Sequence, residues 1–301
     1  MISDKFSVLI TGAGQIAAGY DAPDSDAVLT HAHAIISHPQ FDLVGFHDID
    51  IERAKQASLK WGGGCFSTLQ KADVIVICTP DDVHLESIKQ AVALEPRFII
   101  LEKPVARQYK DVLEIQNLAK DIPVQVNFTR RFVPTFQELA ASKDSLGAFL
   151  TGAGLYGKGF IHNGSHMIDL LRLIVGEIES LEVFYELYDF YSDDPTKTLV
   201  LRFIDGEFYM RGVDCKHYTI FELDLCFEKA RIQILDGGRC VKIYNPVDSQ
   251  IYDGYVVLNL HSEKITEIDH ALLNLYQNVY DHLTCGSQLL SPIDGAVVKG
   301  L

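Results

Sequence analysis

Short apolar runs alternate with longer amphipathic stretches through the first half of the chain. Turn-forming or polar residues follow the runs, which cover residues 6–11, 42–48, 73–78, 98–101 and 123–127. Between them, apolar residues recur at helical spacing in residues 51–60, 83–94 and 107–120. Because short apolar strands separated by helices are typical of parallel sheets, the pattern predicts a doubly wound α/β domain over residues 1–125.

The pattern changes after residue 127. Helices are predicted over residues 128–142, 165–176 and 270–285, and a last helical segment begins at 292. Between residues 181 and 244 apolar and polar positions alternate with a period of two, in the segments 181–189, 199–204, 206–213, 219–227, 230–235 and 240–244. Since period two is the strand period, residues 126–301 are expected to form an α+β domain with a large, mostly antiparallel open sheet. The chain ends just inside its last helical segment, so part of that helix is expected to be missing or dispensable.

Composition narrows the class of protein. Hydrophobic residues make up 48% and charged residues 22% of the chain, which is ordinary for a soluble globular protein. The net charge of −15 argues against a nucleic-acid or anionic-membrane surface. The N-terminus lacks the shape of a signal peptide, and no apolar run has the length of a membrane span. The six cysteines are scattered, which favours reduced thiols in a cytoplasmic protein.

A glycine motif follows the first predicted strand at once. It reads Gly12-Ala-Gly14-Gln-Ile-Ala17 and leads into an alanine-rich helix start. Gly12 would allow a tight turn, Gly14 would let a pyrophosphate approach the backbone, and Ala17 would let the helix pack on the strand. The N–H groups at the helix start, including those of Gln15 and Ile16, would attract the phosphates. The motif therefore predicts a Rossmann dinucleotide site, with a plain tight turn as the alternative.

The end of the second strand carries Asp48. A carboxylate at this place is expected to accept hydrogen bonds from the ribose hydroxyls of the cofactor. No arginine directly follows Asp48, so NAD is favoured and NADP is less expected. Asp50 is expected to cap the helix over residues 51–60. Residues 20–30 form a polar, acidic insert, interpreted as a loop over the cofactor edge whose acids keep it solvated.

The apolar run at 98–101 ends in Glu102-Lys103-Pro104. Because ligands of open α/β sheets bind at the carboxyl ends of the strands, Lys103 is expected at the mouth of a crevice. The alternative is a Lys–Glu pair on a surface loop. Thr79 and Pro80 leave the preceding strand in the same way. His84 then lies near the nicotinamide or is an ordinary histidine at a helix start.

The predicted helix at 165–176 brings further polar groups. His162, His166 and Asp169 could come together, the last two being one turn apart on one face. Two histidines and a carboxylate can bind a metal, but no His-Glu-x-x-His pattern or partner cluster supports it, and no metal is expected. A structural alternative has His166 capping the helix and Asp169 bonding a neighbouring backbone.

These motifs together resemble the Gfo/Idh/MocA family of NAD(P)-dependent oxidoreductases, which includes glucose-fructose oxidoreductase and inositol dehydrogenase. The resemblance covers nearly the whole chain and rests on the glycine motif, Asp48, Thr79-Pro80 with His84, Glu102-Lys103-Pro104, Arg130-Arg131-Phe-x-Pro134 and Gly164-Ser-His166-Met-Ile-Asp169. It implies a Rossmann domain, then an α/β domain for substrate binding and oligomerisation. Homodimers or homotetramers of the family often use the open sheet face.

The resemblance also implies roles for residues. Family members transfer hydride between a nicotinamide and a sugar or polyol hydroxyl or the matching ketone. Lys103 is then expected near the reacting oxygen, with His166 as acid or base. Substrate contacts are expected from His162, Asn163, Asp169 and Arg131. Cofactor contacts are expected from Gly12, Gly14, Gln15, Ile16, Asp48, Thr79, Pro80, His84, Glu102 and Lys103.

One position departs from the family pattern. Many family dehydrogenases carry Asp four residues before the catalytic histidine, where this chain has His162. A histidine suits a substrate with an anionic part, so a sugar acid or a sugar nucleotide of polysaccharide biosynthesis is expected before a neutral polyol. Two alternatives stay open. One is a non-catalytic NAD-binding regulator, and the other is an enzyme of the family that uses a tightly held NAD in a non-redox or self-recycling reaction.

Overall fold

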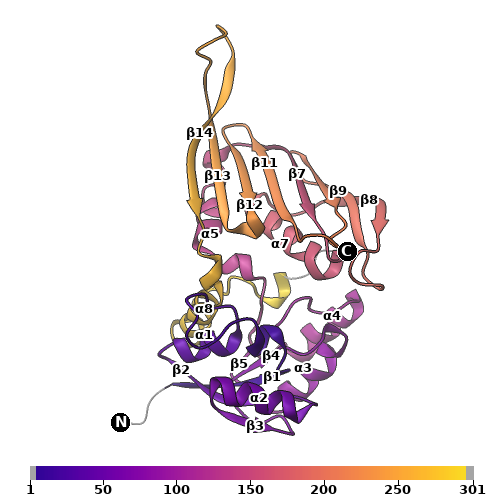
Figure 1. Ribbon diagram of the computed structural model, residues 1–301, viewed down its shortest axis with the longest axis vertical. Coiled ribbons are helices and arrows are strands. Elements are labelled where there is room, and N and C mark those ends of the chain that lie inside the picture. Colours follow the sequence, from indigo (N-terminus) through magenta and orange to yellow (C-terminus); the bar gives the residue numbers. More distant parts are fainter. Residues whose placement is uncertain (1–4, 296–301) are drawn as a thin grey trace. The chain divides into compact units, whose positions relative to one another are not determined.

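The computed structural model describes residues 5–295, which form two compact units (Figure 1). The first unit combines residues 5–132 with 269–295, and the second holds residues 133–268. Although the sequence predicts residues 126–301 as one domain, helix α8 (Ala271–Cys285) belongs to the first unit. Helix α8 joins this unit because its apolar face, which includes the buried residues Leu275 and Tyr276, packs against helix α1 (His31–Ser37).

The first unit is built on a six-stranded parallel sheet with the strand order β3-β2-β1-β4-β5-β6. Its strands are β1 (Phe6–Thr11), β2 (Phe41–His47), β3 (Gly64–Phe66), β4 (Val74–Ile77), β5 (Phe98–Leu101) and β6 (Val124–Val126). This order places the switch point between β1 and β4, where dinucleotides bind in such sheets. The predicted doubly wound sheet is confirmed. Strand β3 was not predicted, because three residues are too few to show a period.

Helices cover this sheet. Besides α1 and α8 they are α2 (Ile51–Trp61), α3 (His84–Val92) and α4 (Tyr109–Leu118), with short helical turns η2 (Asp81–Val83), η3 (Thr129–Phe132), η6 (Ile268–His270) and η7 (Ile293–Gly295). Helices α3 and α4 share an apolar core with β4, β5 and β6. Pro292, where the last helical segment was predicted, precedes η7, and residues 296–301 of that segment lie outside the described residues.

The helix expected at the glycine motif is interrupted. It forms one π-helical turn, η1 (Gln15–Gly19), and the chain then leaves helical structure until Thr30. Helix α1 begins at His31, where the Thr30 side chain caps it by accepting the His33 N–H. A cap of this kind satisfies an N–H that the helix itself leaves unpaired.

The second unit holds an eight-stranded sheet with the order β14-β13-β12-β11-β7-β10-β9-β8. Its strands are β7 (Phe149–Tyr156), β8 (Ser180–Leu187), β9 (Thr196–Arg202), β10 (Glu207–Gly212), β11 (Phe221–Phe227), β12 (Arg231–Leu235), β13 (Cys240–Asp248) and β14 (Val256–Ile265). The β7–β10 pair is parallel and the other neighbours are antiparallel. The prediction of a large, mostly antiparallel sheet is confirmed. Strand β14 was not predicted.

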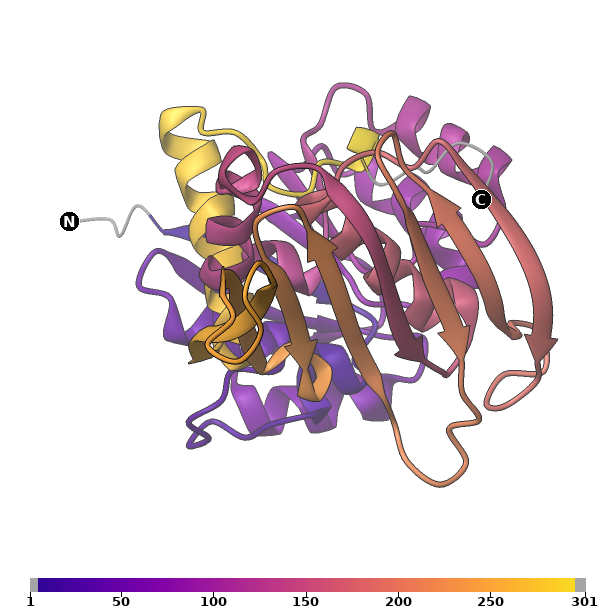
Figure 2. The same ribbon diagram turned by 90° about the horizontal axis from the view of Figure 1, so that it is seen from above.

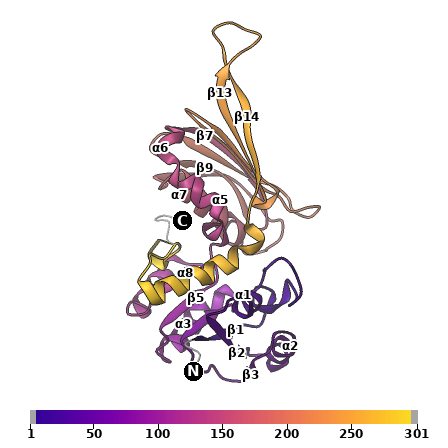
Figure 3. The ribbon, with the colours of Figure 1, turned by 90° about the vertical axis from the view of Figure 1, so that its left-hand side faces the viewer.

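Helices lie along one face of this sheet (Figure 2 and Figure 3). They are α5 (Pro134–Ala141), α6 (Lys143–Leu146), the π-helical turn η4 (Phe160–Gly164) and α7 (Ser165–Ile174). The period-two pattern is visible in β11, where Phe221, Leu223 and Leu225 are buried and the residues between them are partly exposed. None of the helices in the described part of the chain is long and apolar enough to cross a membrane.

Candidate active site

The glycine motif of the first unit forms a tight cradle at the ends of β1 and β4. Gly12 has φ +86°, and a Cβ there would lie 2.5–2.6 Å from backbone atoms of Cys78 and Thr79. A glycine at this position is therefore required for the two strand ends to come together. At Gly14 a Cβ would meet nothing within 4 Å, so its backbone faces open space. This geometry fits the approach of a dinucleotide pyrophosphate to the backbone.

An open recess of about 520 Å³ adjoins the cradle. Residues of the glycine motif line one side, including Gly14 and Gln15, and α2 contributes Arg53, Gln56 and Lys60. The Lys60 ammonium donates to the Ala18 carbonyl at 2.9 Å. The recess thus has two cationic side chains, of which Arg53 lies 3.5 Å from the Asp50 carboxylate. The sequence did not reveal them, because charged residues on an amphipathic helix ordinarily mark its solvated face.

Asp48 lies at the edge of the same cradle. Its Oδ2 accepts the Ala13 N–H at 2.7 Å, and its Oδ1 accepts the Asp50 N–H at 2.9 Å. Asp50 caps α2 by accepting the Glu52 N–H, as predicted. Asp48 thus adjoins the glycine motif directly, and its bond to the ribose stays a prediction.

Glu102 is a buried acid at the carboxyl end of β5. Its Oε1 faces His31 Nε2 at 2.9 Å and accepts the Asn127 side-chain N–H at 2.6 Å. Burial by itself raises the pKa of Glu102, yet the hydrogen bonds from His31 and Asn127 hold that pKa below its ordinary value of 4.5. The Lys103 N–H donates to Glu102 Oε2 at 3.3 Å. The alternative of a Lys–Glu pair on a surface loop is therefore wrong for Glu102.

This hydrogen-bonded group extends to α8. The His31 ring is fully buried, and its Nδ1 lies 3.0 Å from the Tyr276 hydroxyl. Through His31 and Asn127, side chains of α1 and α8 and of the segment after β6 hold the start of the Glu102-Lys103-Pro104 turn. The sequence did not reveal this arrangement, since Tyr276 lies 245 residues from His31.

The insert at residues 20–30 is more than a solvated loop. Asp21 is buried, and it accepts hydrogen bonds from the Leu29 N–H at 2.6 Å and the Thr30 hydroxyl at 2.6 Å. His33 Nδ1 lies 2.8 Å from the same carboxylate. The interpretation that the acids of the insert only keep it solvated is wrong for Asp21, which ties the insert to the start of α1.

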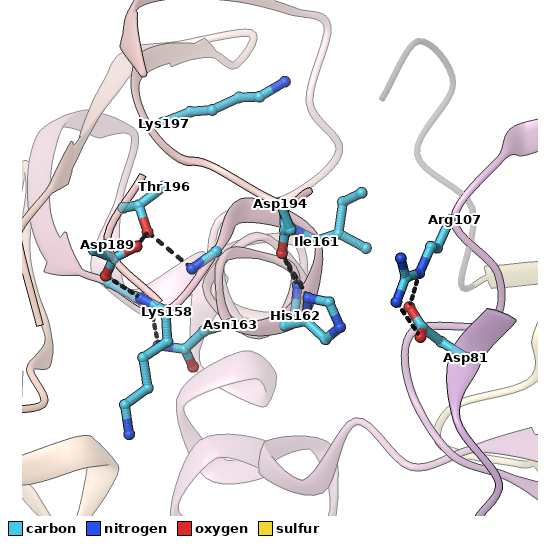
Figure 4. Close-up of polar contacts among 12 residues, drawn as sticks. Asp81, Arg107, Lys158, Ile161, His162, Asn163, Asp189, Asp194, Thr196 and Lys197 are labelled. Carbon is cyan, nitrogen blue, oxygen red and sulfur yellow. Dashed lines mark hydrogen bonds and ion pairs between the residues drawn. The ribbon is translucent and has the colours of Figure 1, made fainter. Parts of the chain in front are cut away.

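Two contacts join the turns that follow β4 and β5. His84 is buried, with Nε2 2.9 Å from the Thr79 carbonyl oxygen and Nδ1 2.9 Å from that of Pro104. Asp81 and Arg107 form a two-pronged ion pair at 2.8 and 2.9 Å (Figure 4). These contacts support a positioning role for His84, and its direct contact with a cofactor stays a prediction.

The first unit also holds the remaining cofactor candidates and one substrate candidate, Arg131. Thr79 bonds the Ser87 hydroxyl at 2.9 Å, and Pro80 is exposed at the start of η2. Ile16 is half-buried in η1. Arg131, in η3, donates to the Leu290 carbonyl at 3.3 Å. Lys103 is half-buried. Their roles stay predictions.

The candidates of the second unit lie on one continuous helical segment, η4 followed by α7. His162 and Asn163 belong to the π-helical turn, and the Asn163 side chain donates to the Gly157 carbonyl at 2.8 Å. His166 is half-buried in the first turn of α7. Asp169 is only 4% exposed, which gives the structural alternative for this residue more support than substrate contact.

His162 has a partner that the sequence did not suggest. Its Nδ1 lies 2.7 Å from Oδ2 of Asp194, which comes from the loop between β8 and β9 (Figure 4). Asp194 also accepts the N–H groups of Ile161 and His162. Burial by itself raises the pKa of Asp194, but the bonds from His162 and the two amides bring that pKa below its ordinary value of 3.8. No pattern signal could have linked residues 32 positions apart.

Within residues 5–295, no three histidine, cysteine, aspartate or glutamate side chains lie close enough together to hold a metal ion. His31, His84 and His162 instead face carboxylates, carbonyl oxygens or a phenol.

Comparison with known proteins gives three kinds of match. Residues 6–129 match the model of an oxidoreductase family with an NAD-binding Rossmann fold. An uncharacterised oxidoreductase of Synechocystis sp. is 27% identical over 137 residues, which is 42% of this chain and 34% of that protein. The alignment thus spans about a third of that relative's length.

Solved structures match over nearly the whole chain. A UDP-N-acetylglucosamine 3-dehydrogenase from Acidithiobacillus ferrooxidans is 14% identical with a TM-score of 0.77, covering 98% of this chain and 94% of that one. A putative myo-inositol dehydrogenase from Sinorhizobium meliloti is 17% identical with a TM-score of 0.70, covering 96% and 92%. A levoglucosan dehydrogenase in complex with NADH and L-sorbose is 14% identical with a TM-score of 0.79, covering 98% and 94%. At these identities the likeness establishes a shared fold.

Proposed function

We propose that this chain is an NAD-dependent dehydrogenase of sugar-type substrates. The premise is that residues 6–129 belong to the Gfo/Idh/MocA oxidoreductase family with its NAD-binding Rossmann fold. The reaction is hydride transfer between the nicotinamide and a hydroxyl-bearing carbon or the matching ketone. The arrangement at the strand ends of the first unit is the main support for this function. There an open glycine cradle adjoins a turn in which a buried carboxylate fixes the backbone of Lys103.

Different residues would bind the cofactor, position Lys103 and exchange the proton. The backbone at Gly14 and the N–H groups of η1 would hold the pyrophosphate, and Asp48 the adenosine ribose. The bound nicotinamide supplies the hydride acceptor or donor. Glu102, held by His31 and Asn127, keeps the turn of Lys103 in place. The Lys103 ammonium then lowers the cost of negative charge on the reacting oxygen, and an imidazole of the η4–α7 segment, His166 by the resemblance, exchanges the proton.

We also propose that this chain binds NAD in preference to NADP. Asp48 directly follows β2, and its carboxylate would repel a 2′-phosphate. Arg53 lines the neighbouring recess, but its guanidinium lies 3.5 Å from the Asp50 carboxylate, which partly neutralises it. The ribose with two hydroxyls is therefore the better match.

A sugar, sugar acid or sugar nucleotide is the proposed substrate class. The family resemblance supports it, and so do the named activities of the UDP-N-acetylglucosamine and levoglucosan dehydrogenases that share the fold. The electrostatic argument for an anionic substrate is weaker than the sequence suggested. Asp194 lies beside His162, so the pair does not carry the net positive charge that a lone cationic histidine would.

A homodimer or homotetramer is also proposed. The face of the eight-stranded sheet opposite the helices has exposed aromatic residues, including Phe184 and Tyr209, beside a recess of about 620 Å³. The β13–β14 hairpin extends past the neighbouring strands of its sheet and exposes further apolar residues, such as Tyr252 and Val256 (Figure 1 and Figure 3). Apolar surface of this extent favours burial against a partner.

Turnover of a sugar-type substrate with NAD⁺ tests the proposed dehydrogenase function. The protein is incubated with NAD⁺ and a panel of sugars, sugar acids and sugar nucleotides, and the absorbance of NADH is followed. Turnover with at least one substrate is expected. Binding of NAD without turnover on the whole panel would leave the non-catalytic regulator in front. NAD released only by denaturing the purified protein would favour the enzyme that recycles its cofactor.

A further inference from the structure

The helical turn that follows the glycine motif ends early. Turn η1 has five residues, and helical structure resumes only at His31. In a Rossmann fold the first helix directs its positive end at the cofactor phosphates, and its negative end lies at the far end of the helix. Here the negative end lies only about 7 Å from the positive one, at a rise of about 1.5 Å per residue. Because the two ends nearly cancel, the backbone of η1 by itself attracts a pyrophosphate weakly.

Lys60, from the last turn of α2, lies at the negative end of η1. Its ammonium donates to the Ala18 carbonyl at 2.9 Å and lies 5.1 Å from the centre of the Trp61 ring. As one of the last carbonyls of a helical turn, the Ala18 carbonyl has no partner within that turn. The N–H of Ala18 donates to the Gly14 carbonyl at 3.0 Å. A single residue thus links the ammonium to the glycine motif.

The charge of Lys60 is not balanced by an acid. Lys60 forms no ion pair within the part of the chain that the structure describes. The other two cations of α2 do: Arg53 lies 3.5 Å from the Asp50 carboxylate. Lys55 lies 3.6 Å from the carboxylate of Glu52. Since Lys60 also lines the recess beside the glycine motif, its ammonium adds a full positive charge there.

We infer that Lys60 is an electrostatic residue of the NAD site. Its ammonium neutralises the negative end of η1 and supplies the positive charge that the shortened helix lacks, so that the pyrophosphate is attracted to the glycine motif. The inference rests on NAD binding at the glycine motif and is independent of the proposed sugar substrate. Lys60 acts here through its charge and needs no contact with the cofactor, so its effect should depend on salt.

Two structural roles for Lys60 are the alternatives. In the first, Lys60 only holds the Ala18 carbonyl; but the Trp61 side-chain N–H donates to the same oxygen at 2.8 Å, so that oxygen keeps a partner without Lys60. In the second, Lys60 stabilises the negative end of its own helix, α2, since it belongs to the last turn. Either role would change the free energy of unfolding and leave the NAD affinity of the folded protein unchanged. NAD affinity and its salt dependence therefore separate these roles from the inferred one.

The experiment titrates NAD by calorimetry into the full-length wild type and into Lys60→Met, which keeps the apolar stem and removes the charge. In about 0.01 M salt we expect the Kd of NAD to rise about 3- to 10-fold, the effect of one charge on two phosphate charges roughly 10 Å away in largely aqueous surroundings. In about 0.15 M salt the difference should shrink, because the screening length falls from about 30 to about 8 Å. Lys60→Arg keeps the charge and should bind NAD as the wild type does.

Further measurements make the test specific. Lys55→Met is the matched control, because it makes the same change in the same helix at a lysine that Glu52 neutralises and that does not line the recess. It should leave the Kd of NAD unchanged. Lys60→Gln keeps an N–H donor for the Ala18 carbonyl without the charge, and it should lose affinity as Lys60→Met does. ADP has the two phosphates but no nicotinamide, so Lys60→Met should weaken ADP and NAD by the same factor. Circular dichroism shows that each variant is folded.

Several results would overturn the role of Lys60 and leave the proposed function standing. They are an unchanged Kd of NAD in Lys60→Met at low salt, a loss that does not shrink as salt is added, wild-type affinity in Lys60→Gln, and an equal loss in Lys55→Met. A wild type that binds neither NAD nor ADP would overturn the role of Lys60 and the proposed function together. A salt-dependent loss in Lys60→Met and Lys60→Gln, with wild-type affinity in Lys60→Arg and Lys55→Met, is the result that supports it.

Discussion

Replacing His31 by phenylalanine tests the buried hydrogen-bonded group beneath Lys103. The substitution keeps a flat ring of similar size in α1 but removes both ring nitrogens. It takes away the contact with Glu102 at 2.9 Å and the contact with Tyr276 at 3.0 Å. The Glu102 carboxylate, 7% exposed, then keeps hydrogen bonds from Asn127 and the Lys103 backbone.

The expected cost follows from the two contacts. A hydrogen bond to a buried charge contributes about 1.5–3 kcal/mol and a neutral one about 1 kcal/mol. We therefore expect the free energy of unfolding of the first unit to fall by about 2.5–4 kcal/mol. In a Glu102→Gln background the same change should cost clearly less, because no buried charge is left without its partner.

Denaturant unfolding followed by tryptophan fluorescence measures this directly. Trp61 is the single tryptophan of the chain, and it lies buried in α2 of the first unit. His38→Phe is the matched control, since His38 is also buried near α1 but faces the neutral amide of Gln277 at 3.2 Å. It should cost about 1 kcal/mol. Equal losses in the two variants would refute the charged contact between His31 and Glu102.

The stability that Glu102 contributes should depend on pH. The pKa of Glu102 in the folded chain lies below its ordinary value of 4.5, so its ionised form contributes stability that is fully present above 4.5. That stability is lost as pH falls through the lower, folded-state pKa. The wild type should therefore lose its advantage over Glu102→Gln on acidification below pH 4.5, and a gap that widens in acid would contradict this.

Three further predictions concern the cofactor and the assembly. Gly14→Ala should leave the free energy of unfolding unchanged, because a Cβ there meets nothing within 4 Å, but it should weaken the binding of NAD measured by calorimetry. Gly12→Ala should destabilise the fold instead, because its Cβ would lie 2.5–2.6 Å from neighbouring backbone atoms. Asp48→Ala should weaken NAD by about 1–3 kcal/mol in the same titration, and tighter binding of NADP than NAD by the wild type would overturn the cofactor preference. Light scattering at micromolar concentration should show a dimer or tetramer that Phe184→Glu dissociates, and a strict monomer in the wild type would count against the proposed assembly.

Local sequence patterns predicted most of the fold. The apolar runs ending at Thr11 and Leu101 have the bounds of β1 and β5, because buried parallel strands are continuous apolar segments. The alternation over residues 219–227 likewise predicted β11. What was missed has physical reasons. Strand β3 is too short for a period, and β14 is exposed along most of its length, so no buried face marks it.

The site was predicted less completely, because its parts meet across large distances in sequence. Residues at strand ends, such as Gly14 and Glu102, follow local signals that the sequence displays. The partners that hold them do not. His31 begins a helix after a long insert, Tyr276 belongs to the far end of the chain, and Asp194 lies in a loop without a motif. Tertiary packing, rather than local pattern, decides which of these polar side chains are buried together.

In the proposed function, the charge of Lys103 serves the reaction, and neither the fold nor the binding of NAD depends on it. The most direct measurement compares Lys103→Met with the wild type, using turnover on the active substrate and NAD affinity by calorimetry. Methionine keeps the length of the side chain and removes its charge. We expect an unchanged NAD affinity and a fall in turnover of about 10²-fold or more, the scale of losing one electrostatic or acid–base group. Full turnover in Lys103→Met would show that its charge has no part in the reaction.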